Sequence, residues 1–409
     1  MQILFIHQNF PGQFVHLSAE LAKRGHDVRA LAIDGQKVGG VQLEKYAIEQ
    51  ASTKGIHPLA AEFETKVIRA QACAKKMMEL RDQGFHPELI VAHPGWGESM
   101  FCKSVFSKAK LINFLEFHYG KGDDAKFDPE FAANKMEDNW RIWVKNANNF
   151  LNYEDMDGAY TPTHWQKKDL PDYIKNKVKV VFDGIDTEVL KPDPGAYLTI
   201  KSKQGEARFA AGEEILTFVN RNLEPYRGYH SFMRSLPKIM KARPNVKVLI
   251  VGGNEVSYGA KPPAGKTWKD IFLDEVKDQI DLKRVFFLGK INRSVFTNLL
   301  QISRCHVYFT YPFVMSWSAV EALSVGALVV GSNTAPVKEF IKHRENGLLV
   351  DFFNYEEIAN TTIDCLAHPK KYDKLRKAAR ESVINNYDLK TVCLPKQIKV
   401  LQGFFKKPL

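Results

Sequence analysis

The sequence predicts an α/β protein built from two doubly wound parallel sheets, and three observations support this fold class. Short apolar strands alternate with amphipathic helices along most of the 409 residues, which is typical of parallel strands covered by helices on both faces. The segment Lys191–Gly212 interrupts the alternation and is rich in proline and glycine, so it separates a first series of elements from a second. The length also favours two or three domains, since a domain has roughly 150 residues.

The first series begins with a β-α-β unit. Its predicted strands are Gln2–Ile6, Val28–Ile33, Leu89–Ala92, Leu111–Glu116 and Val178–Val181. Its predicted helices are Pro11–Lys23, Glu62–Gln83, Glu98–Phe106 and Pro129–Phe150. We assign residues 1–190 to an N-terminal Rossmann-like domain and residues 191–212 to a linker or irregular connection.

The second series, residues 213–389, forms a second Rossmann-like domain. Its predicted strands are Ile215–Val219, Val246–Val251, Val285–Leu288, Val307–Thr310 and Leu328–Gly331. Its first helix is expected at Tyr229–Lys241, and the Gly/Pro-rich stretch Val256–Lys269 is interpreted as an inserted loop. Closing helices are expected at Tyr355–Tyr387 and Leu394–Phe404.

Composition indicates an ordinary folded, basic protein. Lysine and arginine number 58 against 47 acidic residues, a net charge of +11 that favours an anionic partner: nucleotide phosphates, nucleic acid or an anionic membrane face. Five scattered cysteines without a CxxC pair argue against a disulfide framework or a zinc site. No apolar stretch reaches the ~20 residues of a membrane span, and the start MQILFIHQNF lacks a basic leader, so we expect a cytoplasmic protein.

Ligands of open α/β sheets bind where strands end and helices begin, so the strand exits are the places to search. The first exit, His7–Phe14, has Gly12 for close backbone approach but no G-x-G-x-x-G, and a plain tight turn is the alternative. The exit Asn220–Gly228 carries Arg221 and Arg227, which are suited to clamp a pyrophosphate; two solvated arginines are the alternative.

A further exit lies within Phe309–Ser332, where Ser316, Trp317 and Ser318 open a helix that carries Glu321. Backbone N–H groups at this helix start suit a phosphate, and the carboxylate one turn later suits the hydroxyl pair of a ribose. The alternative is a serine cap with Glu321 at the surface or in an ion pair.

The loop His93–Ser99 follows another strand and offers His93, Trp96 and Glu98 for contact with an acceptor, because an indole face suits a sugar ring. The alternative is a Gly/Pro turn with Trp96 packed in the core. The pair Asp155 and Asp157 has the spacing of some metal sites but is interpreted as a solvated loop, so no metal is expected.

The order of motifs resembles the retaining nucleotide-sugar glycosyltransferases of family 4. These motifs are the glycine loop after the first strand, DGID at Asp183–Asp186, R-x5-R-G, VGG at Val251–Gly253, FLG at Phe287–Gly289, a helix ending EAL-x2-G, and ENGLLV. The resemblance implies the GT-B fold: two facing Rossmann-like domains, the second binding the donor, with residues 390–409 packing back on the first. It also implies transfer of a sugar from a nucleoside diphosphate sugar to a hydroxyl of a glycan, lipid-linked or small-molecule acceptor, with retention and without metal or cofactor, as in polysaccharide biosynthesis.

By this resemblance, individual residues acquire expected roles. Arg221 matches a phosphate-binding arginine and Arg227 stands where a lysine is usual. Glu321 matches the second carboxylate of the E-x7-E motif, which binds ribose. His118 resembles the active-site histidine that contacts the donor sugar, and Gly12 resembles the loop glycine that approaches the donor phosphates.

The sequence departs from the family pattern at one place. Phe313 occupies the position of the first carboxylate of E-x7-E, and Val314 stands where glycine is usual. The sugar is then held differently, for example by amides around Met315–Trp317, or the donor is atypical, or the enzyme is inactive.

Other functions remain as alternatives. A nucleotide-sugar epimerase would need no acceptor, and a basic nucleic-acid-binding protein would need a recognised module, which the sequence lacks. We therefore expect no nucleic-acid partner. Peripheral contact with the inner face of a membrane is the expectation for the lysine-rich stretches, with solvated helix faces as the alternative; these stretches are Lys75-Lys76, Lys103–Lys110, Lys167-Lys168 and Lys406-Lys407.

Overall fold

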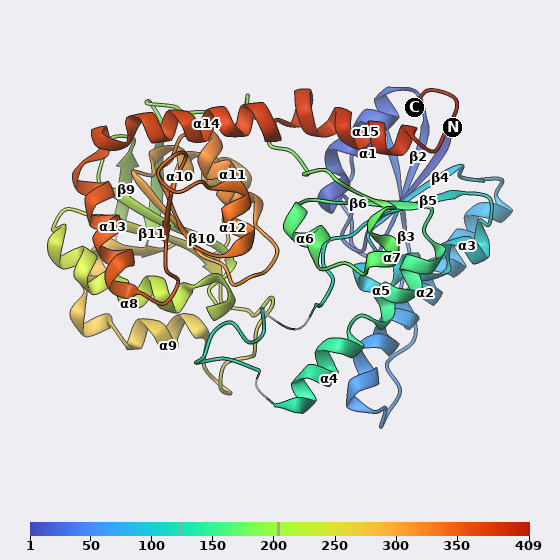
Figure 1. Cartoon of the computed structure of the whole chain (residues 1–409), viewed down its shortest axis with the longest axis horizontal. Coiled ribbons are helices and arrows are strands. Elements are labelled where there is room, and N and C mark those ends of the chain that lie inside the picture. Colours follow the sequence, from blue (N-terminus) through green and yellow to red (C-terminus); the bar gives the residue numbers. More distant parts are fainter. Residues whose placement is uncertain (121, 123, 134, 203–204) are drawn as a thin grey trace. The chain divides into compact units, whose positions relative to one another are not determined.

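The structure, a computed structural model, describes residues 1–409 except 121, 123, 134, 203 and 204. The chain divides into two compact units, drawn in Figure 1 and described separately below. Unit 1 consists of Met1–Asp123, Ala133–Gly184 and Lys390–Leu409. Unit 2 consists of Asp124–Ala132 and Ile185–Leu389.

Unit 1 is built on a seven-stranded parallel sheet in the order β3-β2-β1-β4-β5-β6-β7. Its strands are β1 (Gln2–Ile6), β2 (Asp27–Ala32), β3 (Val41–Lys45), β4 (Leu89–Ala92), β5 (Lys110–Phe114), β6 (Gly158–Thr161) and β7 (Val178–Val180). The parallel sheet confirms the predicted fold class. β3 and β6 were not predicted, because VQLEK is half polar and GAYT is short.

Helices cover both faces of this sheet, as the alternation of side chains along β1 requires. Ile3 and Phe5 pack in one cluster with α1 and α15, whereas Leu4 and Ile6 pack in another with α2. The helix α15 lies beside α1 although the two are far apart in sequence (Figure 1). The helices are α1 (Val15–Lys23), α2 (Pro58–Asp82), α3 (Cys102–Val105), α4 (Met136–Val144), α5 (Ala147–Asp155), α6 (His164–Lys168), α7 (Asp172–Lys175) and α15 (Leu394–Gln402).

Unit 2 has a six-stranded parallel sheet in the order β12-β11-β10-β13-β14-β15. Its strands are β10 (Ile215–Asn222), β11 (Lys247–Gly253), β12 (Val285–Phe287), β13 (Cys305–Tyr308), β14 (Val329–Ser332) and β15 (Leu348–Val350). Its helices are α8 (Tyr229–Ala242), α9 (Trp268–Asp274), α10 (Arg293–Ile302), α11 (Trp317–Ser324), α12 (Ala335–Phe340), α13 (Tyr355–Ala367) and α14 (Asp373–Tyr387). The side chains of α8, α9 and α13 form one buried cluster with one face of the sheet.

Three segments differ from the sequence predictions. The expected linker at 191–212 belongs to unit 2 and contains an antiparallel hairpin of β8 (Tyr197–Ser202) and β9 (Gly205–Ala210), although 203 and 204 lie outside the described residues. Phe209 of β9 is buried and packs on Phe286 of β12, which attaches the hairpin to the core of unit 2. The expected helix Tyr355–Tyr387 is divided after Ala367, because Pro369 cannot continue it.

The prediction of a helix at Pro129–Phe150 was wrong for the first part of this range. Residues 124–132 form no helix and belong to unit 2, residue 134 is outside the described residues, and helix begins only at Met136. A break at Lys145–Asn146 then separates α4 from α5.

None of the described helices is both long enough and apolar enough to cross a membrane.

The core of unit 2 contains a buried polar group. His306 of β13 is fully buried, and its Nδ1 lies 2.8 Å from the hydroxyl of its cross-strand neighbour Thr217, which also bonds Ser303 at 2.7 Å. Burial lowers the pKa of His306 to about 3. The imidazole is therefore neutral in the folded protein at any physiological pH.

We expect this histidine to make stability depend on pH. The unfolded state takes up a proton near pH 6.5 while the folded state does not, so the free energy of unfolding falls as the pH drops from 6.5 toward 3. Between pH 7 and 5 the loss from one such histidine is about 2 kcal/mol. Denaturant unfolding at the two pH values should show a smaller pH effect in His306→Gln than in the wild type. Equal pH effects in both proteins would contradict the assignment.

Candidate functional site

The strand order of each sheet reverses beside the first strand of that sheet. In unit 1 the chain runs from β1 outward through β2 and β3 and then returns to β4 on the other side of β1. In unit 2 the same reversal lies between β10 and β13. Loops that leave the carboxyl ends of two such strands diverge and leave a crevice. The four loops selected from the sequence follow β1, β4, β10 and β13.

In unit 1 these loops and the end of β5 join in a hydrogen-bonded network. His7 Nδ1 accepts from the Asn9 backbone N–H at 3.0 Å, so its Nε2 donates to Gln13 Oε1 at 2.9 Å. Gln13 Nε2 in turn donates to Glu116 Oε1 at 3.0 Å.

His93 repeats the same geometry on the other side of Glu116. Its Nδ1 accepts from the Gly95 backbone N–H at 3.1 Å, and its Nε2 lies 3.3 Å from Glu116 Oε2. The carboxylate of Glu116 therefore links two histidine loops, and 36% of its side chain is exposed.

An aromatic group lies over this network. The Trp96 indole stacks on His93 with ring centroids 4.4 Å apart and meets His7 edge-on at 4.9 Å. Burial and the neighbouring His93 lower the pKa of His7 to about 4, so His7 is neutral. The predicted residues His93 and Trp96 are thus brought together, and Trp96 is only half-buried.

Glu98 does not join them. Its side chain is fully buried, and Tyr46 donates a hydrogen bond to Glu98 Oε1 at 3.1 Å. Burial raises the pKa of this carboxyl group. The expected contact of Glu98 with an acceptor therefore lacks the exposed side chain that such a contact needs.

Gly12 has a structural reason to be glycine. Its φ is +48°, and a Cβ at this position would lie 2.2 Å from Nε2 of His7. Any side chain would therefore displace the imidazole from Gln13.

His118 lies beyond β5, where its ring packs against Phe150 and Tyr153 of α5. Its Nδ1 is 3.1 Å from the Tyr153 hydroxyl, and burial lowers its pKa to about 4. His118 is thus a neutral imidazole held through one nitrogen, which leaves Nε2 for another partner.

In unit 2 the two predicted arginines have different environments. Arg221, the penultimate residue of strand β10, is exposed and has no ion pair within the described part of the chain. Arg227 ends the 3₁₀ turn Pro225–Arg227 and is buried. Its Nη1 donates to Thr310 Oγ1 and to the Val314 carbonyl oxygen, both at 2.8 Å.

Two aromatic rings cover the Arg227 guanidinium group. Tyr258 lies 4.9 Å and Phe313 5.6 Å from it, measured to the ring centroids. Burial acts to lower the pKa of Arg227, but the tyrosines and Glu224 around it outweigh burial and raise the pKa. Phe313, which replaces the first carboxylate of the motif, therefore contributes an aromatic face to a buried cation.

Glu224 fixes Tyr258 in place. It is fully buried and accepts hydrogen bonds from the backbone N–H groups of Ser257, Tyr258 and Gly259 at 3.2–3.4 Å. The loop after β11 is thereby tied to the loop after β10.

The start of α11 is capped within the chain. Ser316 Oγ accepts from the Ser318 backbone N–H at 3.3 Å, and the Ser318 hydroxyl donates to the same oxygen at 2.9 Å. The Ser316 backbone N–H donates to the Tyr308 hydroxyl at 2.8 Å. Two of the amides expected to meet a phosphate, those of Ser316 and Ser318, are therefore engaged, while Trp317 between them is half-buried.

Glu321 lies one turn further along α11 and is 3% exposed. Its Oε1 is 2.5 Å from Nη2 of Arg293, the first residue of α10. Burial raises the pKa of Glu321, and Arg293 opposes that shift. The ion pair that the sequence left as an alternative is thus present.

Sequence reasoning missed several residues that hold these sites. His7, Gln13 and Glu116 each follow a strand of the first series, so their position was a usable signal. Thr310 is the last residue of a predicted strand, but Tyr258 lies in the Gly/Pro-rich insertion, where no periodicity marks it.

The interpretation of Asp155 and Asp157 as a solvated loop was wrong for Asp157, which has a structural role, while Asp155 is exposed at the end of α5. Asp157 accepts from Lys103 at 2.6 Å, from Lys110 at 2.8 Å and from the Leu111 backbone N–H at 2.9 Å, and thereby joins α3 to β5. Within the described residues no group of three or more His, Cys, Asp or Glu side chains is arranged for a metal ion.

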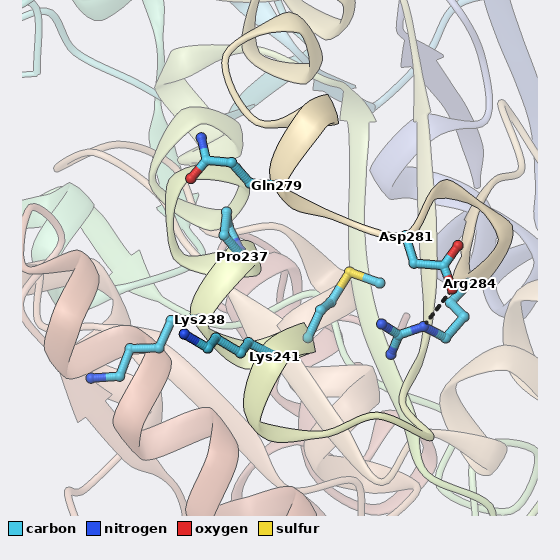
Figure 2. Close-up of a pocket in the computed structure, with 7 residues that line it drawn as sticks. Pro237, Lys238, Lys241, Gln279, Asp281 and Arg284 are labelled. Atoms are coloured by element: carbon cyan, nitrogen blue, oxygen red, sulfur yellow. Dashed lines mark hydrogen bonds and ion pairs between the residues drawn. The ribbon is translucent and has the colours of Figure 1, made fainter.

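A hollow of about 460 Å³ in unit 2 contains none of the predicted site residues (Figure 2). It is lined by Pro237, Lys238, Met240, Lys241, Gln279, Asp281 and Arg284. Arg284 pairs with Asp281 at 3.0 Å and Lys238 pairs with Glu356, so most of the positive charge that lines the hollow is neutralised. The strand-end loops remain the candidate site.

Comparison with known proteins agrees with the fold. Residues 24–190 match the model of the glycosyl transferase family 4 group, and residues 200–382 match glycosyl transferases group 1. Sucrose-phosphate synthase from Thermosynechococcus elongatus has a similar structure, with a TM-score of 0.74, 17% identity and 99% of each chain covered. Anabaena HepE in complex with UDP and glucose gives a TM-score of 0.68 at 15% identity, with 99% of this chain and 100% of that chain covered.

Among curated sequences, spore coat protein SA of Bacillus subtilis is 25% identical over 228 residues, which cover 52% of this chain and 55% of that protein. The chain thus spans about half the length of the curated relatives it matches. The two family models together extend over most of the sequence, and the solved structures share both sheets. The chain belongs to the group 1, family 4-like glycosyltransferases and has the GT-B fold.

Proposed function

We propose that this protein transfers a sugar from a nucleoside diphosphate sugar to a hydroxyl of a glycan, lipid-linked or small-molecule acceptor, with retention of anomeric configuration. The observation that carries the proposal is the arginine pair at the switch point of unit 2, where Arg221 is exposed and Arg227 is buried. Positive charge at such a crevice suits a diphosphate. The UDP and glucose in the HepE structure support a donor of this class.

In this proposal the protein acts mainly by electrostatic stabilisation. Departure of the nucleotide builds negative charge on the diphosphate, and Arg221 meets that charge directly. Arg227 holds the loop Thr310–Val314 through its two hydrogen bonds and so positions the start of α11. Because the cations come from arginine, the proposed reaction needs neither metal nor cofactor.

The donor sugar meets an unusual surface. Phe313 offers no oxygen for sugar hydroxyls, so those hydroxyls are bound elsewhere. His118 is suited to one such contact through Nε2, as a neutral donor or acceptor and not as a general acid, because its pKa is about 4.

The acceptor is assigned to the strand ends of unit 1. The half-buried Trp96 provides an apolar face, and Glu116, held between Gln13 and His93, provides carboxylate oxygens for acceptor hydroxyls. A role in polysaccharide biosynthesis and peripheral contact of basic stretches with an anionic membrane complete the proposal.

The first test is a thermal-shift panel of UDP, GDP, ADP and TDP with their sugar conjugates, and NAD as control. A ligand at 100 times its Kd adds about 2.7 kcal/mol of stability, and we expect one base to stand out. Incubation of the matching nucleotide sugar with acceptors should then release nucleotide, and a chelator should leave the rate unchanged. Absence of stabilisation by every diphosphate would overturn the proposal, and a metal requirement would overturn its metal-independent form.

Arg221→Ala should lower transfer about tenfold or more while the thermal unfolding curve stays unchanged, because the lost group is an exposed cation that bonds the diphosphate. Arg208→Ala is the matched control, since Arg208 is also exposed in unit 2 but lies on the hairpin strand β9. Wild-type turnover in Arg221→Ala would remove Arg221 from the phosphate site.

Glu321→Gln tests the ribose contact. The wild type should bind UDP, or the nucleotide selected by the panel, about tenfold more tightly than its 2′-deoxy form, because a carboxylate accepts strong hydrogen bonds from ribose hydroxyls. The variant should lose most of this preference, whereas exposed Glu345→Gln should keep it. Calorimetric titration measures both constants, and an unchanged preference in Glu321→Gln would exclude the contact.

A further inference from the structure

A short piece of the first half of the sequence lies in unit 2. Residues Asp124–Ala132 belong to unit 2, although the chain on both sides of them belongs to unit 1. We call this stretch the 124–132 segment. It lacks helix and strand, so side chains must hold it in place.

Two aspartates of the segment hold two tyrosines of unit 2. The Tyr226 hydroxyl donates to Asp124 Oδ2 at 2.7 Å, and the Tyr311 hydroxyl donates to Asp128 Oδ2 at 2.7 Å. His230 Nε2 also lies 2.9 Å from Asp128 Oδ2. Asp128 is 2% exposed; burial acts to raise its pKa, but the His230 and Tyr311 contacts outweigh burial and lower the pKa, so it is a buried anion.

Apolar and ionic contacts anchor the rest of the segment. The Phe127 ring lies 5.2 Å from the rings of Tyr311 and Phe352, and Phe131 lies 5.2 Å from Trp268. Glu130 forms a bidentate pair with Arg234 at 2.6 and 2.9 Å. Arg234 of this pair lies on α8, and no side-chain hydrogen bond joins Glu130 to Tyr226 or Tyr311 in the described structure. Burial raises the pKa of Tyr311, and the Glu130 charge acts in the same direction at longer range.

Each tyrosine is adjacent in the chain to a residue of the arginine site: Tyr226 to Arg227 itself and Tyr311 to Thr310, which accepts a hydrogen bond from Arg227. Tyr226 precedes Arg227 in the chain, and its carbonyl oxygen accepts from the Tyr311 backbone N–H at 3.0 Å. Their rings lie 4.6 Å apart, and the Tyr226 ring meets Phe313 edge-on at 5.5 Å. Contact therefore continues from Asp124 and Asp128 through these rings to the Phe313 face that covers Arg227.

We propose that Asp124 and Asp128 are positioning residues for the donor site, which they act on by fixing Tyr226 and Tyr311 beside Arg227 and Phe313. This inference rests on the proposed function, since the site is taken to bind a nucleoside diphosphate sugar. It assigns to the 124–132 segment a role in donor affinity that is separate from anchoring the segment itself.

The experiment compares Asp124→Asn and Asp128→Asn with Glu130→Gln, the matched control that loosens the same segment without touching the tyrosines. Each aspartate variant should bind the selected nucleoside diphosphate about three- to tenfold more weakly and raise the donor KM more than it lowers kcat, and Glu130→Gln should do neither. Tyr311→Phe should reproduce Asp128→Asn, and the double variant should be no worse than either single one. Equal nucleotide affinities in the aspartate variants and the control would overturn the inference.

A second measurement needs no ligand. Amide hydrogen exchange of peptides covering 224–228 and 308–316 should be faster in the aspartate variants than in Glu130→Gln, because loss of the tyrosine contacts loosens both loops. If the wild type binds no nucleoside diphosphate, the proposed function is wrong. The exchange rates still test whether the aspartates hold the two loops, because that measurement needs no nucleotide. If Asp128→Asn does not fold, Asp124→Asn and Tyr226→Phe supply the same comparison. Identical exchange in all variants would overturn the positioning role even where nucleotide binds.

Discussion

The arrangement of unit 2 depends on one buried positive charge. A guanidinium group cannot leave water without acceptors around it, because unpaired burial costs several kcal/mol. Arg227 obtains them from the loop after β13, which also supplies the Phe313 ring, and the Tyr258 ring from the loop after β11 covers it as well. Gly228 next to it has a φ of +67°, and a Cβ there would lie 2.4 Å from Phe309 Cβ, so the backbone itself is fitted to this approach. Loops from three neighbouring strands thus converge on a single side chain.

In unit 1 the switch-point loops are held together without a buried cation. Its switch-point loops meet through the imidazoles of His7 and His93, the amide of Gln13 and the partly exposed carboxylate of Glu116. Such a surface presents hydrogen-bonding groups and an aromatic face but little positive charge. Under the proposed function, this difference between the units fits a diphosphate in unit 2 and a hydroxyl-bearing acceptor in unit 1.

The fold class and the switch-point loops could be predicted from the sequence. Strands such as LIVA are buried on both faces, so composition alone identifies them, and the polar residues that follow them fall at the sheet edge where ligands bind. The fold class and the loops of both switch points follow from that pattern. Family resemblance added expected roles for His118, Arg221 and Glu321, and those roles remain predictions.

The features that could not be predicted from the sequence depend on contacts between distant segments. Arg221 and Arg227 are the same residue type in one short stretch of sequence, yet Arg221 is exposed, whereas Arg227 is buried by the Tyr258 and Phe313 rings from other loops. Phe127 and Phe131 have helical spacing, yet both pack on unit 2 from an irregular segment. Glu98 looks like a loop acid until its burial against Tyr46 is known.

The return of α15 to unit 1 has a consequence for the order of folding during synthesis. Ile398, Leu401 and Leu409 belong to the same buried cluster as Ile3 and Phe5 of β1. These residues leave the ribosome only after the whole of Ile185–Leu389 has been made. During synthesis the N-terminal domain usually completes its folding first. Here unit 2 can complete its core earlier, because one face of the unit 1 sheet is not covered until α15 has been made.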